Sequence, residues 1–195
     1  MSPVVAATSQ DAQELAQLVF ASAPLQLTEL FGQGDQLKAQ AFLQRSFQSE
    51  NGQYGYANHF VIRKHQVVAC ACVWHDRLAS DFDKATLAAI VAFFGAEQAM
   101  QILLANQSLQ GDLQFPQAHQ LALGHLSVAE SARKQGLAKV LIEHASQIAR
   151  RLNKAEICVD VDKTNTAALA LYSKCNFNYL STSPSGKHER WVRTV

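Results

Sequence analysis

A short loop between an apolar strand and an amphipathic helix holds the residues best suited to binding a phosphate group. The motif Arg133-x-x-Gly136-x-Ala138 follows the strand and directly precedes the helix. The first turn of a helix has N–H groups without intrahelical acceptors, and the helix dipole adds partial positive charge there. Because Gly136 and Ala138 are small, the backbone can approach phosphate oxygens closely. The loop therefore predicts a pyrophosphate site.

The residue pattern of this motif is weakly specific by itself, and its placement between a strand and a helix makes it informative. With glycine near 7% of residues, the bare pattern arises by chance in roughly one chain in five of this length. Its other interpretation is a solvated basic turn before a surface helix. Placement between a strand and a periodic helix is what a phosphate cradle requires. No Gly-Lys-Ser/Thr follows, and the three glycines of a dinucleotide fingerprint are missing, so both of those loop types are excluded.

A second segment places a tyrosine on one face of a short helix. Ala168, Leu171 and Tyr172 follow one another at helical spacing after Asn165. Taken alone, Asn165 is a helix N-cap and Tyr172 a core aromatic residue. Read together with the loop, the phenol becomes a candidate proton donor near whatever the pyrophosphate carries.

These two segments resemble the two motifs of the GNAT superfamily, the Gcn5-related N-acetyltransferases. The segment from Leu126 to Lys139 is similar to the acetyl-CoA motif of that family, and the segment from Asn165 to Phe177 is similar to its downstream motif. The resemblance covers about Ala122 to Tyr179. The chain departs from the family pattern at Glu130, where proline is common, and at Asn176, where glycine is usual. Because asparagine tolerates the left-handed conformation, we expect the turn at Asn176 to survive.

The resemblance implies a fold and a cofactor site. The fold would be a single domain of the α/β (α+β) class, with a mixed, mostly antiparallel twisted sheet flanked by helices. The sheet would be splayed between its two central strands, with pantetheine between the strand ending at Val128 and the strand Ile157 to Val161. Tyr172 would act as the general acid at the sulfur. The residues implied to bind acetyl-CoA are Leu126, Ser127, Val128, Arg133, Lys134, Gln135, Gly136, Leu137, Ala138, Lys139, Asn165, Ala168, Tyr172 and Lys174.

The expected reaction is the direct attack of a primary amine on the thioester of acetyl-CoA. The amine must lose a proton, and His125 in the strand beside the cofactor is the nominal base. His119 and Glu130 are the other candidates. Cys72 or Cys175 as an acyl-carrying nucleophile would give a ping-pong route, which is disfavoured because the sequence shows no paired histidine.

The elements that must position these residues alternate between strand and helix. The expected strands are 4–7, 60–63, 67–74, 119–128, 157–162, 178–182 and 189–195, and the expected helices are 9–23, 27–31, 35–48, 136–152, 166–174 and a helical region from Asp83 onward that Gly95 interrupts. Gly111 and Pro116 mark a loop. This order predicts a mixed sheet with helices on both faces.

Composition bounds the class of protein. The chain has 195 residues, is 48% hydrophobic and 17% charged, and has a net charge of +1, so we expect one domain over residues 1–195 that binds no nucleic acid. The N-terminus lacks signal-peptide features, and Leu87 to Phe94 is too short to span a membrane. We therefore expect a cytoplasmic protein without a membrane partner. The four cysteines lack zinc-ribbon spacing, so reduced core thiols and no bound metal are expected.

The acceptor is predicted only as a primary amine of a small molecule or a peptide. The N-terminal helices and the 83–106 helices precede the cofactor motifs and would form the acceptor site. They carry aromatic side chains that either line an acceptor pocket or fill the core: Phe31, Phe42, Phe47, Tyr54, Tyr56, Phe93 and Phe94. Two other functions stay open, a non-catalytic module that senses acyl-CoA and a transferase for a longer acyl group. A homodimer is compatible with the sequence.

Overall fold

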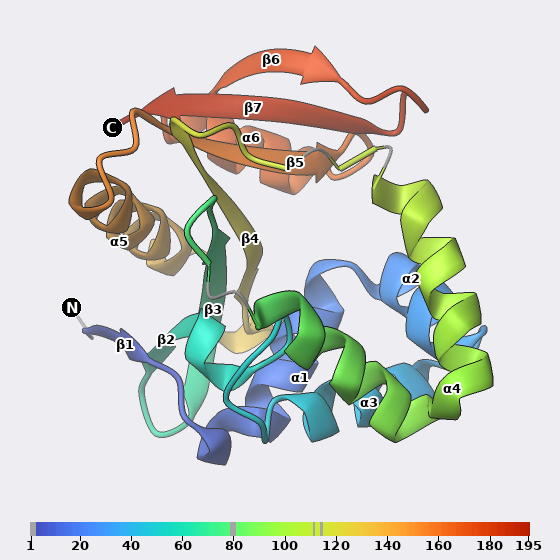
Figure 1. Cartoon of the computed structure of the whole chain (residues 1–195). Helices are drawn as coiled ribbons and strands as arrows, with labels where there is room; N and C mark the ends of the chain where they lie inside the picture. The colour runs from blue at the N-terminus through green and yellow to red at the C-terminus, as the bar shows by residue number, and fades with distance from the viewer. Residues whose placement is uncertain (1–2, 79–80, 111, 114) are drawn as a thin grey trace. The chain divides into compact units, whose positions relative to one another are not determined.

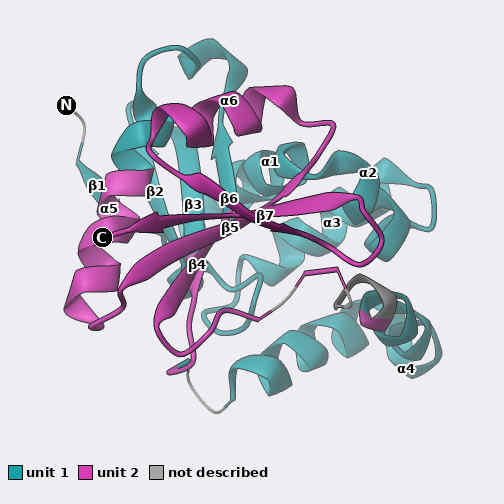
Figure 2. Cartoon of the chain, turned by 90° about the horizontal axis from the view of Figure 1, so that it is seen from above, with its two compact units in different colours: residues 1–72, 78–106, 125–141 teal, residues 73–77, 107–124, 142–195 magenta. Residues whose placement is uncertain are grey.

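The computed structural model of the chain describes residues 3–78, 81–110, 112, 113 and 115–195. Contacts divide the chain into two compact units, which Figure 2 colours separately. Unit 1 holds residues 1–72, 78–106 and 125–141, and unit 2 holds residues 73–77, 107–124 and 142–195. The single domain expected over residues 1–195 stays a prediction.

The order of helices and strands follows the sequence pattern (Figure 1). The strands are β1 (Val4–Ala6), β2 (His59–Arg63), β3 (Val67–Trp74), β4 (Gln120–Val128), β5 (Glu156–Asp162), β6 (Asn178–Thr182) and β7 (His188–Thr194). The helices are α1 (Ala12–Ser22), α2 (Pro24–Leu27), α3 (Gln36–Ser46), α4 (Phe82–Gln110), α5 (Leu137–Arg151) and α6 (Thr166–Lys174). Four shorter helical turns lie at Ser9–Asp11, Thr28–Gly32, Tyr56–Asn58 and Glu130–Ala132. The predicted loop residue Gly111 lies outside the described residues.

The sheet is mixed and mostly antiparallel, as predicted. In unit 1, β1 pairs with β2 and β2 with β3 in antiparallel fashion, and the N–H of Ala129, just after β4, donates to the Val68 carbonyl of β3 at 2.8 Å. In unit 2, the first residues of β4 pair in parallel with β5, and antiparallel pairs join β5 to β7 and β7 to β6. The strand order is therefore β1-β2-β3-β4-β5-β7-β6, with β4 shared by both units.

The sequence favours Ser9 and Asp83 as helix N-caps, and the structure corrects both. Thr8, rather than Ser9, caps the first helical segment, and its N–H and hydroxyl both donate to the Asp11 carboxylate at 2.7 and 3.0 Å. Such reciprocal capping satisfies donors that a helix start leaves unpaired. Asp83 is not the cap of α4 but an acidic residue within its first turn, where it still complements the helix dipole.

The core of unit 1 is built from aromatic side chains. Phe31, Phe42 and Phe47 are almost fully buried, and the ring centroids of Phe31 and Phe42 lie 4.3 Å apart. Phe93 and Phe94 bring α4 against the same cluster, with centroids 5.6 and 5.1 Å from that of Phe42. Of the two interpretations of these aromatics, core packing therefore applies to these five.

Helix α4 extends well beyond the short apolar run seen in the sequence. By length and composition, the described helix over Phe82–Gln107 could cross a membrane. Gly95, however, has φ 77° and ψ 165°, which are not helical angles. The kink leaves two pieces that are each shorter than the roughly 17 residues that a membrane span needs.

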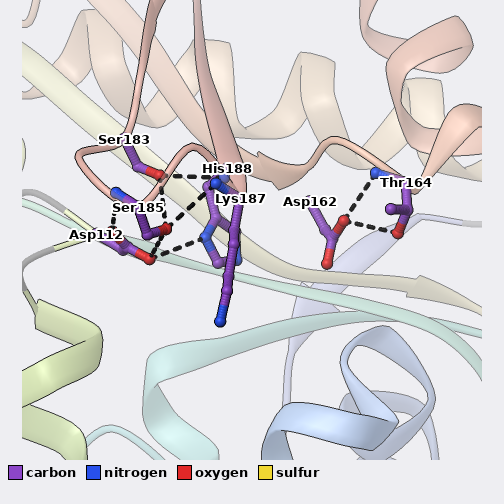
Figure 3. Close-up of polar contacts among 7 residues, drawn as sticks. All are labelled: Asp112, Asp162, Thr164, Ser183, Ser185, Lys187 and His188. Atoms are coloured by element: carbon purple, nitrogen blue, oxygen red, sulfur yellow. Dashed lines mark hydrogen bonds and ion pairs between the residues drawn. The ribbon is translucent and has the colours of Figure 1, made fainter.

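In unit 2, an aspartate holds the turn between β6 and β7 (Figure 3). The Ser185 N–H donates to Oδ1 of Asp112 at 3.0 Å, and the Ser185 hydroxyl donates to the same carboxylate. His188 Nδ1 lies 3.8 Å from Asp112 Oδ2. The carboxylate thus fixes the turn around residues 184–186.

Candidate active site

The predicted phosphate loop lies on the surface of unit 1. Residues 133–136 and Lys139 are exposed, and Leu137 and Ala138 are half-buried. Gly136 has φ +77°, and an added Cβ would have nothing within 4 Å. Glycine is therefore required here by the left-handed backbone rather than by close packing. The loop is open, so a phosphate group has access to it.

A single turn of 3-10 helix over Glu130–Ala132 fixes the approach to the loop. The Ala132 N–H donates to the Ala129 carbonyl at 2.8 Å, and the Ala132 side chain is buried. The Arg133 N–H donates to the Glu130 carbonyl at 3.2 Å, so this amide is occupied, and the cradle expected over residues 133–139 would begin one residue later. Further on, Val140 N–H donates to Gly136 O at 3.2 Å, and the amides of Leu137–Lys139 form the first turn of α5, whose N–H groups lack intrahelical acceptors.

Lys64 adds a cation that the sequence did not indicate. It lies in the turn between β2 and β3, and its Nζ donates to Oε1 of Gln135 at 2.7 Å. The two residues are 71 positions apart, so no local pattern could have connected them. With Arg133, Lys134 and Lys139, this lysine gives the exposed loop a basic surround that fits a pyrophosphate.

The strand before the loop carries an irregular residue at the candidate base. His125 has φ +49° within β4, a conformation uncommon for a residue with a Cβ. A Cβ at the preceding Gly124 would lie 1.9 Å from Cζ3 of Trp74, so only glycine fits beneath that ring. Strain of this kind persists only where surrounding structure imposes it, and it clusters at functional sites.

His125 is hydrogen-bonded to a second histidine, which sequence analysis missed. Nε2 of His59 lies 2.9 Å from Nδ1 of His125, and Nδ1 of His59 lies 3.1 Å from the Gly55 carbonyl oxygen. His59 is opposite Cys72 in the β2–β3 register. Because Cys72 is short, the rings from β2 and β4 can meet on the same face of the sheet.

Burial keeps this pair of histidines uncharged. It lowers the pKa of His59 to about 4, against the small opposing effect of the bond to Gly55. Burial also holds the pKa of His125 well below 6.5, and charge on His59 would lower it further. Both imidazoles are therefore neutral at pH 7, and a neutral imidazole is the form that accepts a proton.

The same cluster contains a donor set for a soft metal ion. Sγ of Cys72 and one ring nitrogen each of His59 and His125 lie within 4.8 Å of one another. Two nitrogens bound to one tetrahedral zinc would be about 3.3 Å apart, whereas these two are 2.9 Å apart along a hydrogen bond. The arrangement as it stands is a hydrogen-bonded pair, and we assign no metal to it.

Aromatic rings hold the two imidazoles in place. The Phe47 ring meets the His59 ring edge-on, with centroids 4.9 Å apart. The Tyr54 ring stacks on that of His125, with centroids 5.6 Å apart and planes inclined by 14°. Tyr54, one of the aromatics predicted for an acceptor pocket or the core, thus lines the candidate base.

The second motif lies in unit 2 on α6 and has the predicted local structure. Oδ1 of Asn165 accepts from the Ala168 N–H at 3.1 Å, so Asn165 is the N-cap. The preceding turn is held by Asp162, which accepts from the Thr164 N–H and hydroxyl at 2.7 Å each (Figure 3). Asn176 has φ +62°, which confirms that asparagine takes the left-handed position where the family usually has glycine.

Tyr172 is 8% exposed and packs against Phe177, with ring centroids 5.3 Å apart. Burial raises the pKa of its phenol above the usual value of 10. The hydroxyl therefore keeps its proton at neutral pH. Because a thiol has an ordinary pKa of about 8.5, the phenol is the weaker acid, and its proton would move to a leaving thiolate only with reprotonation of the phenolate by solvent.

The other candidate bases and site residues differ in burial and in the unit to which they belong. His119 is exposed and lies 3.4 Å from Glu156 in unit 2, whereas Glu130 is exposed in unit 1 at the 3-10 turn. Cys175 is buried. Of the three candidate bases, His125 is the one joined to a second histidine in its own unit. Lys174 is exposed at the end of α6.

Comparison with known proteins identifies the type of fold. The family model described as the acetyltransferase (GNAT) family matches residues 25–177. No protein with a curated description matches the chain. The structure of an N-acetyltransferase from Staphylococcus aureus Mu50 is 16% identical, with a TM-score of 0.68 over 100% of both chains. That of SsHAT is 15% identical, with a TM-score of 0.69 over 98% of this chain and 97% of the other. At such identities the likeness shows the fold alone.

Proposed function

The chain belongs to the acetyltransferase (GNAT) family, whose acyl donor is acetyl-CoA, and we propose that it acetylates a primary amine of a small molecule or a peptide. One observation carries the proposal. Within unit 1, a continuous segment from His125 to Lys139 joins a neutral, hydrogen-bonded imidazole to an exposed loop with a left-handed glycine. A base and a phosphate cradle on one segment suit a transferase better than a passive binding module.

We propose that the loop and the end of β4 hold the donor. The amides from Lys134 to Lys139 would bind the pyrophosphate, and the backbone of Leu126–Val128 would pair with pantetheine as an added strand. Bound acetyl-CoA supplies a thioester whose carbonyl carbon an amine can attack. A strand N–H between Leu126 and Val128 would polarise that carbonyl.

We assign the proton transfers of this reaction to two residues. His125 Nε2 would take the proton that the amine loses as the C–N bond forms. Tyr172 would give its proton to the sulfur as the C–S bond breaks, and solvent would then reprotonate the phenolate. The products are an acetamide and CoA thiol, and the proton on His125 returns to solvent. Each residue works in its neutral form, which agrees with the directions of their pKa shifts.

A covalent route through Cys72 has one specific observation in its favour. The sequence disfavoured it for want of a paired histidine, and the structure places Cys72 Sγ within 4.8 Å of ring nitrogens of His59 and His125. Cys72 is fully buried, however, and a nucleophile must reach the thioester. Direct attack is therefore the proposal, with a sensing module and transfer of a longer acyl group as alternatives. A cytoplasmic location and a homodimer are parts of the same proposal.

The proposal is tested by binding and turnover. We expect acetyl-CoA to raise the melting temperature by several degrees at about 100 times Kd, since ligand binding stabilises by about 2.7 kcal/mol there. CoA should stabilise comparably, because the cradle binds the pyrophosphate, and acetylated pantetheine without the nucleotide should not. Release of free thiol across a panel of amines then separates an enzyme from a sensor. Absence of any stabilisation by acetyl-CoA would reject the scheme.

A further inference from the structure

Three groups of unit 1 form a directional chain of hydrogen bonds. It runs from the Gly55 carbonyl to Nδ1 of His59 at 3.1 Å and from Nε2 of His59 to Nδ1 of His125 at 2.9 Å. A carbonyl oxygen can only accept, so the proton at Gly55 must belong to His59 Nδ1. In a neutral imidazole the other nitrogen then carries a lone pair. His59 Nε2 is therefore an acceptor, and His125 Nδ1 must be the donor.

This assignment determines the tautomer of His125. A neutral His125 that donates through Nδ1 carries its own lone pair on Nε2. Without an acceptor at Nδ1, an imidazole distributes its proton over both nitrogens, and the nitrogen that faces a substrate would often be protonated and unable to act as a base. The orientation of one ring nitrogen by a hydrogen bond at the other is a general way of preparing histidine for chemistry.

We infer that His59 is a positioning residue, which fixes His125 as the Nδ1–H tautomer and so keeps the Nε2 lone pair on the atom that accepts the proton of the acceptor amine. The inference rests on the proposed function for the role of Nε2. The tautomer itself rests only on the Gly55–His59–His125 chain. His59 is 2% exposed, so it acts through His125 and does not itself meet a substrate.

The surroundings of the pair favour such a role over simple filling of the core. A buried polar group needs its hydrogen bonds satisfied, and an aliphatic side chain would fill this space at no such cost. The Tyr54 stack and the Phe47 edge hold both ring planes within the apolar core, so rotation of either imidazole is opposed. The Sγ of Cys70 donates to the His125 carbonyl at 3.5 Å, which anchors the strained backbone of the base.

The tautomer can be measured without any activity. Long-range ¹H–¹⁵N spectra of uniformly ¹⁵N-labelled protein at pH 7.5 report which nitrogen of each histidine is protonated. We expect Nδ1–H for both His59 and His125 in the wild type. In His59→Leu we expect His125 to become a mixture or the Nε2–H form, whereas His59→Gln, whose side-chain carbonyl reaches the place of Nε2, should keep Nδ1–H.

Steady-state kinetics provide a second test of the inference. His59→Leu should lower kcat roughly 10- to 100-fold while the KM for acetyl-CoA stays within about twofold, and His59→Gln should recover most of the loss. The acid limb of the kcat/KM profile should move to higher pH in His59→Leu, because the charge that His59 can carry no longer opposes protonation of His125. Among the described residues, the titratable side chains in direct contact with the pair are those of Tyr54, Cys70 and Cys72, and all three are unchanged in both variants.

A matched control separates positioning from stability. Val61→Ala changes another fully buried residue of β2 and should lower the melting temperature while leaving kcat and the tautomer of His125 as in the wild type. An Nε2–H form of His125 in the wild type, or full kcat in folded His59→Leu, would overturn the inference. If no amine is acetylated but the tautomer of His125 still depends on His59, the positioning stands and the proposed function fails.

Discussion

His59 and His125 are joined by a hydrogen bond of 2.9 Å although 66 residues separate them in the chain. They come from β2 and β4, and the strand between them places the short side chain of Cys72 opposite His59. The contact links β4, the strand proposed to bind the donor, to the aromatic core of unit 1. A change in the packing of this core would therefore affect both His59 and the proposed base, His125.

Tyr172→Phe tests the proposed acid. The change removes only the hydroxyl, so we expect kcat to fall by about 10²-fold with the KM for acetyl-CoA unchanged, since loss of a general acid raises the barrier and leaves ground-state binding intact. Release of CoA thiol measures this. Tyr179→Phe, at a tyrosine that is 54% exposed, is the control and should behave as the wild type. Equal rates for both variants would remove Tyr172 from the reaction.

Gly136→Ala tests the phosphate loop. Its φ of +77° is unfavourable for alanine, while the absence of any atom within 4 Å of an added Cβ means that no clash results. We expect a loss of about 1 kcal/mol in folding and a several-fold weaker affinity for acetyl-CoA, measured by calorimetric titration.

Gly186→Ala is a matched control for this change. Gly186 has φ +74° and nothing within 4 Å of an added Cβ, and it lies in the turn between β6 and β7. The backbone strain should be similar, but acetyl-CoA affinity should be unaffected. Equal weakening of binding by the two variants would show that the effect reflects general strain rather than the loop.

Lys64→Ala tests the cation supplied from the β2–β3 turn. Loss of the Nζ bond to Gln135 and of one charge at the loop should raise the KM for acetyl-CoA several-fold at low salt, with kcat little changed. The difference from the wild type should shrink as salt rises, because exposed charges are screened. Lys187→Ala, at an exposed lysine of unit 2, is the comparison. A KM that is insensitive to Lys64 at 20 mM salt would exclude it from the site.

Stability should fall with acidity because the buried His59 resists protonation. The pKa of His59 is about 4 in the folded state against 6.5 for the ordinary group. Below pH 6.5 the unfolded chain binds a proton that the folded chain does not, so the contribution of His59 is fully present above pH 6.5 and is lost as the pH falls to about 4. The loss amounts to about 3 kcal/mol.

Urea unfolding at pH 7.5, 6 and 5 measures this dependence. His59→Gln should flatten it, while His65→Gln, at an exposed histidine of the β2–β3 turn, should leave it unchanged. Burial also lowers the pKa of His125, of His75 and of His144, so some slope remains in every variant. An identical slope in His59→Gln and the wild type would contradict the prediction.

Cys72→Ala distinguishes direct attack from a covalent route. If the amine attacks the thioester directly, turnover should stay within about threefold of the wild type, and stability should fall by about 1 kcal/mol through loss of a buried sulfur. Intact-mass spectra after mixing with acetyl-CoA should show no acetylated protein. An acetyl adduct on the wild type that disappears in Cys72→Ala would favour the ping-pong route instead.

Local patterns were enough to predict most of the fold and the local structure of the two motifs. Strand periodicity, the Asn165 cap and the Gly136 loop depend on interactions among residues a few positions apart, which is why the predicted elements and the left-handed Asn176 are confirmed. The cap at Thr8 was missed because Thr8 and Ser9 are neighbouring residues of types that both cap helices. The helical region from Asp83 onward and its interruption at Gly95 are confirmed.

The tertiary structure decided which side chains are hydrogen-bonded to one another. Lys64 reaches Gln135, and His59 reaches His125, only because strands distant in sequence become neighbours in the sheet, and no spacing rule encodes that distance. The same neighbours supply the burial that keeps both imidazoles neutral. The sequence determined which residues can do chemistry, since that depends on their side chains and local backbone; the fold decided which protonation state and which tautomer they hold, since those depend on solvent exclusion and on long-range hydrogen bonds.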